Sequence, residues 1–252
     1  MQSKTGLNSE ECIISYASKG REEYNSALLK LIKSIPENWN GDTILYSFDG
    51  YVDRYEGIPI RLCHSKQTPQ PEAWMAHHHS EIPYQFKPAI FQIAKEEGYK
   101  KVYWCDSTIR LLKNPLPLFE QSESGIVAFE NLGHPLWNWI SDDAQNTLKI
   151  TNEELKTIPQ IMACVIGFDF TKAKANNIFE EWAIIAQDGH SFKDNPSARE
   201  GFKAHRHDQA VLSGLLWKHK IPLLPYGKLV YPPHDVNGEY GNDIYFVNKG
   251  MG

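Results

Sequence analysis

Asp106 is the first side chain in the sequence that could do chemistry. It follows the apolar stretch Lys101 to Cys105, which has the character of a short buried strand, and a turn comes next. A carboxylate at the end of a buried strand loses much of its water, so it usually meets a cation or a polar ligand. We therefore expect Asp106 to belong to a binding site.

Two further candidates for such a site are Lys87 and Asp208. Lys87 lies just before Pro88 in a helical stretch and could act as a point charge, although an exposed helix lysine is the common alternative. Asp208 begins another helical stretch, where it either caps the helix or faces a ligand. The basic run His205 to His207 before it adds candidate phosphate contacts, although a lone histidine is more often structural.

The elements that must position these residues belong to a chain of 252 residues, enough for one large α/β domain or two small ones. A chain of this size buries roughly 70 to 75% of its unfolded surface. Hydrophobic residues make up 41% and charged residues 23%, as in soluble globular proteins. The net charge of -5 argues against stable nucleic-acid binding, which needs a basic surface.

The cysteine pattern favours a reducing compartment. Four cysteines are far apart and form no C-x-x-C pair, so free buried thiols and a cytoplasmic location are expected; they are Cys12, Cys63, Cys105 and Cys164. The N-terminus shows no apolar leader. The apolar stretch from 158 to 168 is far shorter than the ~20 residues that span a bilayer, so no membrane segment is expected.

Strand and helix patterns alternate along the first half of the chain. They predict strands at Cys12 to Tyr16, Thr43 to Phe48, Ile58 to Cys63 and Lys101 to Cys105, with helices at Tyr24 to Ile35 and from Pro83 to a cap at Gly98. This order predicts right-handed crossovers and a mostly parallel central sheet with helices on both faces. Ligands of such sheets bind at the carboxyl ends of the strands, where Asp106 and the residues after Tyr16 lie.

The second half is less regular. It predicts strands at Gly125 to Phe129 and Ile161 to Phe168, helices at Asn176 to Gln187 and Asp208 to His219, and edge or loop segments from Ile221 to Tyr231. No internal repeat and no linker rich in glycine and serine interrupts the chain. One compact α/β domain is the simplest interpretation.

Four segments in this order carry a resemblance to a known family. They are CIISYASKGREEY, YQFKPAIFQIAKEEGYKKVYWCDST, QIMACVIGFDF and HRHDQAVLSGLLWKHK, and together they extend over nearly the whole chain. They resemble nucleotide-sugar glycosyltransferases of the GT-A fold, of bacterial or viral type. The resemblance implies a single GT-A-like domain at 1–252, with a nucleotide-sugar donor half at 1–115 and an acceptor half at 116–252.

The resemblance also implies how a nucleoside-diphosphate sugar, such as a UDP-sugar, would be bound. The residues implied in donor binding are Ser15, Tyr16, Ala17, Arg21, Lys87, Asp106, Ser107 and Thr108. The last three stand where the family has its metal-binding D-x-D motif, so this chain has D-S-T instead.

A divalent cation, Mn²⁺ or Mg²⁺, is implied as cofactor but stays an open question. Such a hard cation screens the diphosphate and normally takes two carboxylates, whereas here Thr108 replaces the second. The implied metal ligands are Asp106 and His234, the latter resembling a late histidine that closes the site in the family.

Asp208 is implied as the catalytic residue, either binding acceptor hydroxyls or acting as the base of an inverting displacement. Gly167 is implied as a point of close backbone approach to a sugar. The expected activity is transfer of a hexosyl or related sugar to a carbohydrate or other hydroxyl acceptor. The alternatives are an inactive sugar- or nucleotide-binding protein derived from a transferase, and a nucleotidyltransferase.

Overall fold

The computed structural model describes residues 9–16, 22–47, 54–55, 57–62, 82–230 and 243–250. The predicted site residues Ala17, Arg21 and His234 lie outside the described residues, as does Cys63. The other three cysteines are free and buried, as expected.

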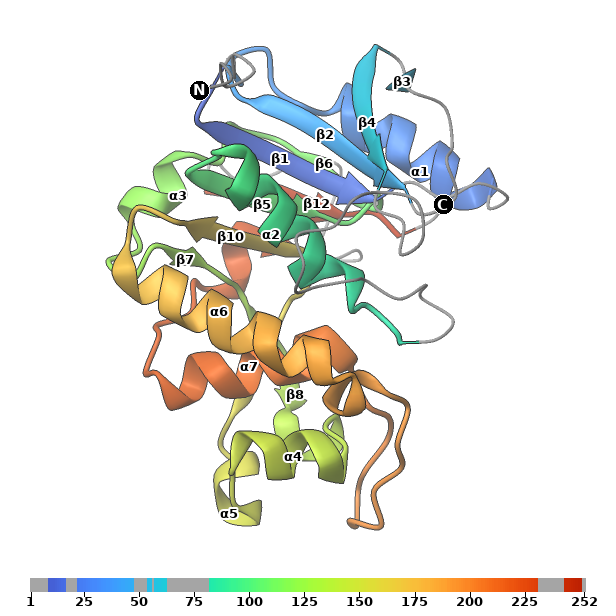
Figure 1. Ribbon diagram of the computed structural model, residues 1–252, viewed down its shortest axis with the longest axis vertical. Helices are drawn as coiled ribbons and strands as arrows, with labels where there is room; N and C mark the ends of the chain where they lie inside the picture. Colours follow the sequence, from blue (N-terminus) through green and yellow to red (C-terminus); the bar gives the residue numbers. More distant parts are fainter. Residues whose placement is uncertain are drawn as a thin grey trace, which may run out of the picture.

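The central sheet has seven strands in the order β3-β4-β2-β1-β5-β10-β7 (Figure 1). Their bounds are β1 Glu11–Tyr16, β2 Asp42–Ser47, β3 Arg54–Tyr55, β4 Ile58–Leu62, β5 Lys101–Cys105, β7 Ile126–Val127 and β10 Val165–Asp169. Strands β4, β2, β1 and β5 pair in parallel, while β3 and β10 pair antiparallel to their neighbours. The fold class predicted from sequence is therefore confirmed: a mostly parallel sheet in a mixed α/β fold.

The two faces of the sheet carry separate hydrophobic cores. Successive side chains of a strand point to opposite faces, so Ile13 and Ile14 of β1 enter different cores. Ile14 packs in one core with Phe91 of α2 (Phe86–Glu97), and Ile13 in the other with Leu28 of α1 (Glu22–Lys33). Helices therefore cover both faces, as expected.

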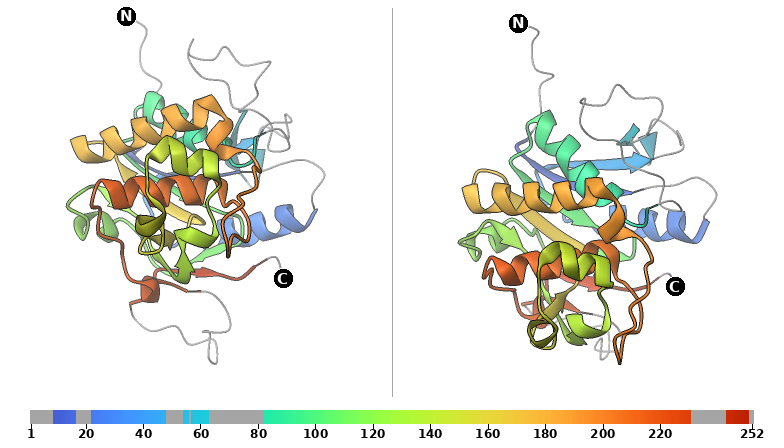
Figure 2. Two further views of the ribbon diagram at one scale, coloured as in Figure 1. Left: turned by 90° about the horizontal axis from the view of Figure 1, so that it is seen from below. Right: turned by 60° about the horizontal axis from the view of Figure 1, so that its bottom comes forward.

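Two more long helices complete the first core. These are α6 (Ala173–Asp188) and α7 (His207–Lys218), which contact each other and lie side by side in Figure 2. The predicted cap of α2 is confirmed, since Gly98 has φ 105 and its N–H bonds the end of the helix. Positive φ is costly for residues with a Cβ, which explains glycine at this position.

Shorter elements flank the sheet. A three-stranded sheet joins β11 (Leu229–Val230), β12 (Phe246–Asn248) and β6 (Ile109–Leu111), next to α3 (Pro117–Glu120). A ribbon of β8 (Glu130–Pro135) and β9 (Pro159–Ile161) leads to α4 (Asp142–Leu148) and α5 (Asn152–Leu155). Three 3-10 turns lie at Leu136–Asn138, His190–Phe192 and Tyr226–Lys228.

One predicted strand was wrong. The run Ile161 to Phe168 is not a single strand, because β9 ends at Ile161 and β10 begins at Val165. The Met162 N–H still donates to the Phe129 carbonyl, in register with the pairing of β8 and β9, and the chain then reverses with the Val165 N–H donating to the Met162 carbonyl. The apolar side chains of this turn are buried, so the turn has none of the polar residues that mark a surface loop.

No helix in the described ranges is both long enough and apolar enough to cross a membrane.

Candidate functional site

Three charged side chains from distant parts of the chain meet at the carboxyl end of β5. The Lys87 ammonium lies 2.9 Å from Asp208 Oδ2 and 3.4 Å from Asp106 Oδ1, and it donates a hydrogen bond of 2.9 Å to the Ala163 carbonyl. Lys87 is only 2% exposed. We call Lys87, Asp106 and Asp208 the lysine triad. The structure therefore brings together the three residues that the sequence singled out first.

Each member of the lysine triad comes from the beginning or end of a regular element. Lys87 is the second residue of α2, and Asp106 follows β5, where its N–H donates to the Cys164 carbonyl. Asp208 is the second residue of α7, and no side chain caps that helix. The interpretation of Asp208 as a helix cap is therefore wrong.

The balance of charges keeps Lys87 protonated. Burial by itself would lower the pKa of Lys87, but the charges of Asp106 and Asp208 outweigh burial, so its pKa is raised. The pKa of Asp208 is also raised. Here burial is the cause, because the attraction of Lys87 does not fully compensate for the lost water. The contact between Lys87 and Asp208 is an ion pair rather than a well-aligned hydrogen bond.

Asp106 is the member of the lysine triad that reaches solvent. Its side chain is 34% exposed, against 4% for that of Asp208. The Trp104 indole N–H donates a hydrogen bond of 2.6 Å to Asp106 Oδ1, the same oxygen that faces Lys87. One carboxylate oxygen of Asp106 is thus held from two sides, which fixes the orientation of the side chain for a ligand.

Aromatic rings enclose the Lys87 ammonium. Its nitrogen lies 5.1 Å from the ring centres of both Tyr84 and Trp104, within cation–π range. Tyr84 in turn stacks on His207, at 5.5 Å between ring centres. Tyr84 has φ 59 and His207 has φ 38, backbone conformations that cost energy for residues with side chains. Such strain concentrates at functional sites.

Sequence reasoning missed the roles of Tyr84 and Trp104. A signal existed for Trp104, because residues two apart on an extended strand share a face, and this places Trp104 on the side of Asp106. The sequence carried no signal for Tyr84.

The residues predicted for the donor nucleotide are in part occupied with other contacts. The Ser15 hydroxyl is buried and donates to the Cys105 carbonyl at 2.6 Å, tying the ends of β1 and β5 together. Tyr16 stacks on Phe86 at the start of α2, with 4.7 Å between ring centres. Ser107 is buried, and the Thr108 carbonyl accepts a hydrogen bond from the Lys249 N–H.

His205 is a structural residue, the second of the two alternatives for it, because both of its ring nitrogens contact the protein. Its Nδ1 accepts from the Ser141 N–H at 3.1 Å and its Nε2 lies 2.9 Å from the Ser191 carbonyl. Burial, helped by the nearby His207, lowers the pKa of His205 to about 4. His205 is therefore neutral at pH 7 and joins the segments that contain Ser141 and Ser191.

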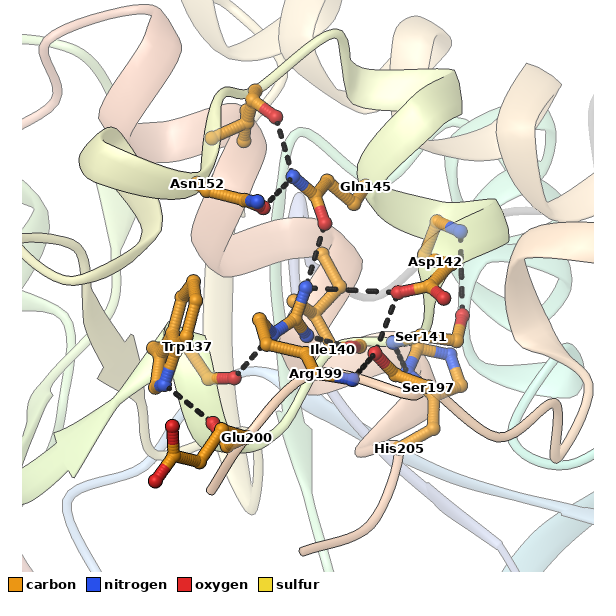
Figure 3. Close-up of polar contacts among 12 residues, drawn as sticks. Trp137, Ile140, Ser141, Asp142, Gln145, Asn152, Ser197, Arg199, Glu200 and His205 are labelled. Atoms are coloured by element: carbon orange, nitrogen blue, oxygen red, sulfur yellow. Dashed lines mark hydrogen bonds and ion pairs between the residues drawn. The ribbon is translucent and has the colours of Figure 1, made fainter. Parts of the chain in front are cut away.

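Arg199 makes a second such junction (Figure 3). Its guanidinium donates to the carbonyls of Trp137 and Ile140 and to Gln145 Oε1, and it lies 3.7 Å from Asp142 Oδ1. The segment before α7 is thereby fixed against α4, and with it the start of the helix that carries Asp208.

Two amides meet at the start of α7. The Gln209 side chain donates to Gln160 Oε1 at 3.0 Å, while Gln160 Nε2 is buried without a hydrogen-bond partner. A buried donor without a partner is costly and is a natural point for a ligand contact. Gln209 was part of the family-like segment but was not chosen from sequence.

Gly167 has a packing explanation. A Cβ at this position would lie 2.6 Å from the Tyr103 ring and 3.0 Å from Val127. The absence of a Cβ leaves room for the Tyr103 ring across the sheet face. This packing explains the glycine without any contact between its backbone and a sugar.

The described residues fit a divalent cation poorly. None of them form a group of three or more histidine, cysteine, aspartate or glutamate side chains that could hold a metal. The nearest carboxylates, Asp106 and Asp208, face a lysine ammonium, which repels a second cation.

Comparison with known proteins supports the fold. No protein-family model and no curated protein matches the chain. Among solved structures, the apo structure of the bifunctional glycosyltransferase WbbM is similar, with a TM-score of 0.53 and 15% sequence identity. The match covers 94% of this chain and 45% of that one, so the chain spans less than half of its length.

The galactosyltransferase LgtC, solved in complex with donor and acceptor sugar analogs, is a weaker match. Its TM-score is 0.49 at 11% identity, over 94% of this chain and 86% of that one. The likeness to WbbM shows the fold alone: this chain has a GT-A-like fold of the glycosyltransferase type.

Proposed function

We propose that the protein is a glycosyltransferase that moves a sugar from a nucleoside-diphosphate sugar to a hydroxyl acceptor. The observation that carries this proposal is the lysine triad, which lies at the carboxyl end of β5 in a sheet of glycosyltransferase type. Open α/β sheets bind their ligands at this edge. The nucleotide and the acceptor in this proposal come from the family resemblance of the sequence.

The reaction breaks the bond between the anomeric carbon and the diphosphate oxygen, which keeps the bonding electrons. A new bond forms from the anomeric carbon to the acceptor oxygen, and the acceptor proton leaves to a base. Asp208 is the proposed catalytic carboxylate, because burial raises its pKa and so improves it as a proton acceptor. The stereochemical course depends on which face of the sugar Asp208 meets.

In this proposal Asp106 contacts the donor, because it is the exposed carboxylate of the lysine triad. Lys87 orients Asp106 and Asp208, since its ammonium already faces both carboxylates and the Ala163 carbonyl. The role first assigned to Lys87, a direct phosphate contact, would require one of these partners to be replaced by the ligand. Tyr16, stacked on Phe86, extends the same edge toward the nucleotide.

Whether the reaction needs a divalent cation is tested by experiment. Mn²⁺ or Mg²⁺ would supply charge for the leaving diphosphate. Because the described carboxylates face a lysine instead, we expect donor binding to persist in EDTA.

The test is a thermal-shift screen of nucleoside diphosphates and their sugars, each with Mn²⁺ and with EDTA. A ligand at 100 times its Kd adds about 2.7 kcal/mol to the free energy of unfolding. The same shift is expected for wild type and for Lys95→Met, a surface change on α2, and a reduced shift for Asp106→Asn. No shift with any nucleoside diphosphate would contradict the proposal.

One observation favours a second candidate, an inactive sugar- or nucleotide-binding protein. The second carboxylate of the D-x-D motif is absent, with Thr108 in its place. Release of free nucleotide from the donor that gives the largest shift separates the two candidates. Release that is lost in Asp208→Asn would exclude the inactive protein.

A further inference from the structure

Trp137 and Trp139 are two residues apart, and each has two cations against its ring. Lys156 and Arg199 lie 5.2 and 4.9 Å from the ring centre of Trp137. Lys203 and Arg206 lie 5.4 and 4.4 Å from that of Trp139. The two arrangements have similar distances, so a difference in their nearby negative charge can separate a structural role from a binding role.

The cations at Trp137 are neutralised. Lys156 forms an ion pair of 2.9 Å with Glu153, and Arg199 lies 3.7 Å from Asp142 (Figure 3 shows the Arg199 contacts). Each of the three guanidinium nitrogens of Arg199 also donates one hydrogen bond to a protein acceptor. These two cations have a structural explanation.

The cations at Trp139 are not neutralised. The side chains of Lys203 and Arg206 are exposed, and neither forms an ion pair or a hydrogen bond with the side chain of any described residue. His134 also lies against Trp139, with 5.6 Å between ring centres. We call His134, Trp139, Lys203 and Arg206 the Trp139 patch. Its basic groups face one ring with no carboxylate among them.

The electrostatics of His134 agree with this excess of positive charge. Burial lowers the pKa of His134, and the nearby Arg206 and Lys203 lower it further. A carboxylate within the Trp139 patch would act in the opposite direction.

The backbone holds the Trp139 patch in place. The Lys203 N–H donates to the Asn138 carbonyl at 2.8 Å, and the Arg206 N–H to the Trp139 carbonyl at 3.0 Å. The Cα atoms of both basic residues are therefore fixed beside the ring, within reach of it for both side chains.

The Trp139 patch also adjoins the lysine triad. Arg206 is two residues before Asp208, so their Cα atoms are at most about 7 Å apart. Asp208 is the carboxylate to which the proposed function assigns the proton transfer. A group bound at the Trp139 patch is therefore held next to the start of the helix that carries Asp208.

We propose that the Trp139 patch binds an anionic oxygen group, a carboxylate or a phosphate, on the acceptor saccharide. That the bound saccharide is the acceptor rests on the proposed function, whereas the binding of an anionic group does not. Arg206 offers a planar fork that matches either group, Lys203 adds a point charge, and Trp139 offers a ring edge to the sugar. An anionic membrane surface is disfavoured, since such surfaces are recognised by clusters of about four to eight basic residues.

The test measures binding without any donor. Purified protein is titrated by calorimetry with methyl glucuronide, glucose 6-phosphate and neutral methyl glucoside. We expect an acidic probe to bind at least about tenfold more tightly than methyl glucoside, because charge-assisted hydrogen bonds are the stronger ones. The acidic probe that binds more tightly identifies the carboxylate or the phosphate as the natural group.

Matched variants locate the binding. Lys203→Gln and Arg206→Gln should each weaken binding of the acidic probe by about tenfold or more, whereas Lys156→Gln, the equivalent change at Trp137, should not. Equal melting temperatures of the variants show that folding is not the cause. Unchanged affinity in Arg206→Gln, or equal binding of acidic and neutral probes, would overturn the proposal.

Two further outcomes separate this inference from membrane binding and from the proposed transferase function. Binding to phosphatidylserine vesicles that Arg206→Gln abolishes, with no binding of the acidic sugars, would overturn it in favour of a membrane surface. If no nucleoside diphosphate binds but the acidic sugar does, the proposed transferase function fails and the anion site stands.

Discussion

The lysine triad and the Trp139 patch both place cations against tryptophan rings, yet they differ in burial and in charge balance. Lys87 is 2% exposed and faces two carboxylates, whereas Lys203 and Arg206 are exposed and face none. A buried ammonium without a partner costs several kcal/mol, so its surroundings must supply the opposite charge. An exposed cation has no such need and keeps its attraction for a ligand.

This difference separates a cation that positions other side chains from cations that can bind a ligand. In the lysine triad the cation fixes the orientation of Asp106 and Asp208, and the contacts within the protein are already made. In the Trp139 patch the ring and the backbone fix the cations, and the contacts with a ligand are still to be made. Substitutions in the lysine triad should therefore lower stability, whereas substitutions in the Trp139 patch should weaken ligand binding and leave stability nearly unchanged.

The largest effect is expected from Lys87→Met. It leaves the buried Asp208 charge without its ion pair, which should lower the free energy of unfolding by about 3–5 kcal/mol and abolish transfer. Urea denaturation and a nucleotide-release assay measure the two losses. Lys95→Met, on the surface of the same helix, should cost less than about 1 kcal/mol. Equal losses in the two variants would remove the distinction between a buried and an exposed cation.

Asp208→Asn should affect activity more than stability. If Asp208 accepts the acceptor proton, turnover falls by about a thousandfold, while the loss in unfolding free energy stays below that of Lys87→Met, because Lys87 keeps Asp106 as a partner. Asp194→Asn, an exposed carboxylate near the start of the same helix, is the matched control and should leave turnover unchanged. A loss of turnover that merely follows the loss of stability would make Asp208 a structural residue.

The pH dependence of stability should reveal His205. Its pKa is about 4 when folded and about 6.5 when unfolded, so the unfolded state binds more protons between these values. The stability due to neutral His205 is present above pH 6.5 and is lost as the pH falls to 4, by about 3 kcal/mol at most. Denaturation of wild type and His205→Gln at pH 7 and pH 4.5 isolates this loss.

The exposed His190 gives the control for that comparison, because His190→Gln should keep the full pH dependence of the wild type. Parallel pH profiles for wild type and His205→Gln would contradict the assignment of His205 as a neutral buried junction.

The smallest effect is expected from the Trp139 patch itself. Lys203→Gln and Arg206→Gln break no ion pair among the described residues and lose only an exposed cation–π contact, so each should change the free energy of unfolding by less than about 1 kcal/mol. Urea denaturation of both variants beside Lys87→Met gives the sharpest form of the comparison. A loss above 1 kcal/mol in either would mean that the cation serves the fold rather than a ligand.

Much of the fold could be predicted because its elements carry strong local signals. Strand β5 was predicted to the residue, since its apolar run is bounded by Gly98 on one side and a turn on the other. The reversal after Ile161 was not predictable from the same reasoning, because all the residues around it are apolar. The helices α4 and α5 were missed because they are short, although Ser141 and Thr151 are good caps.

The lysine triad could be predicted in part, and the Trp139 patch could not. Asp106 follows the rule that ligand groups lie at strand ends, and Lys87 and Asp208 came from the family resemblance. Nothing local in the sequence indicated that all three would meet. Trp139 and His134 lie in irregular segments without periodicity, so only the folded chain brings them to Lys203 and Arg206. The division into donor and acceptor halves stays a prediction.

The hydrogen bond from Trp104 to Asp106 has a spectroscopic consequence. The indole N–H lies 2.6 Å from a carboxylate that is itself partly exposed, and an ammonium lies over the same ring. The emission of an indole responds to charges and hydrogen bonds near it, so Trp104 is a built-in optical reporter of whatever approaches Asp106. The difference in fluorescence between wild type and Trp104→Phe would therefore follow ligand arrival at this edge of the sheet in real time, without a label.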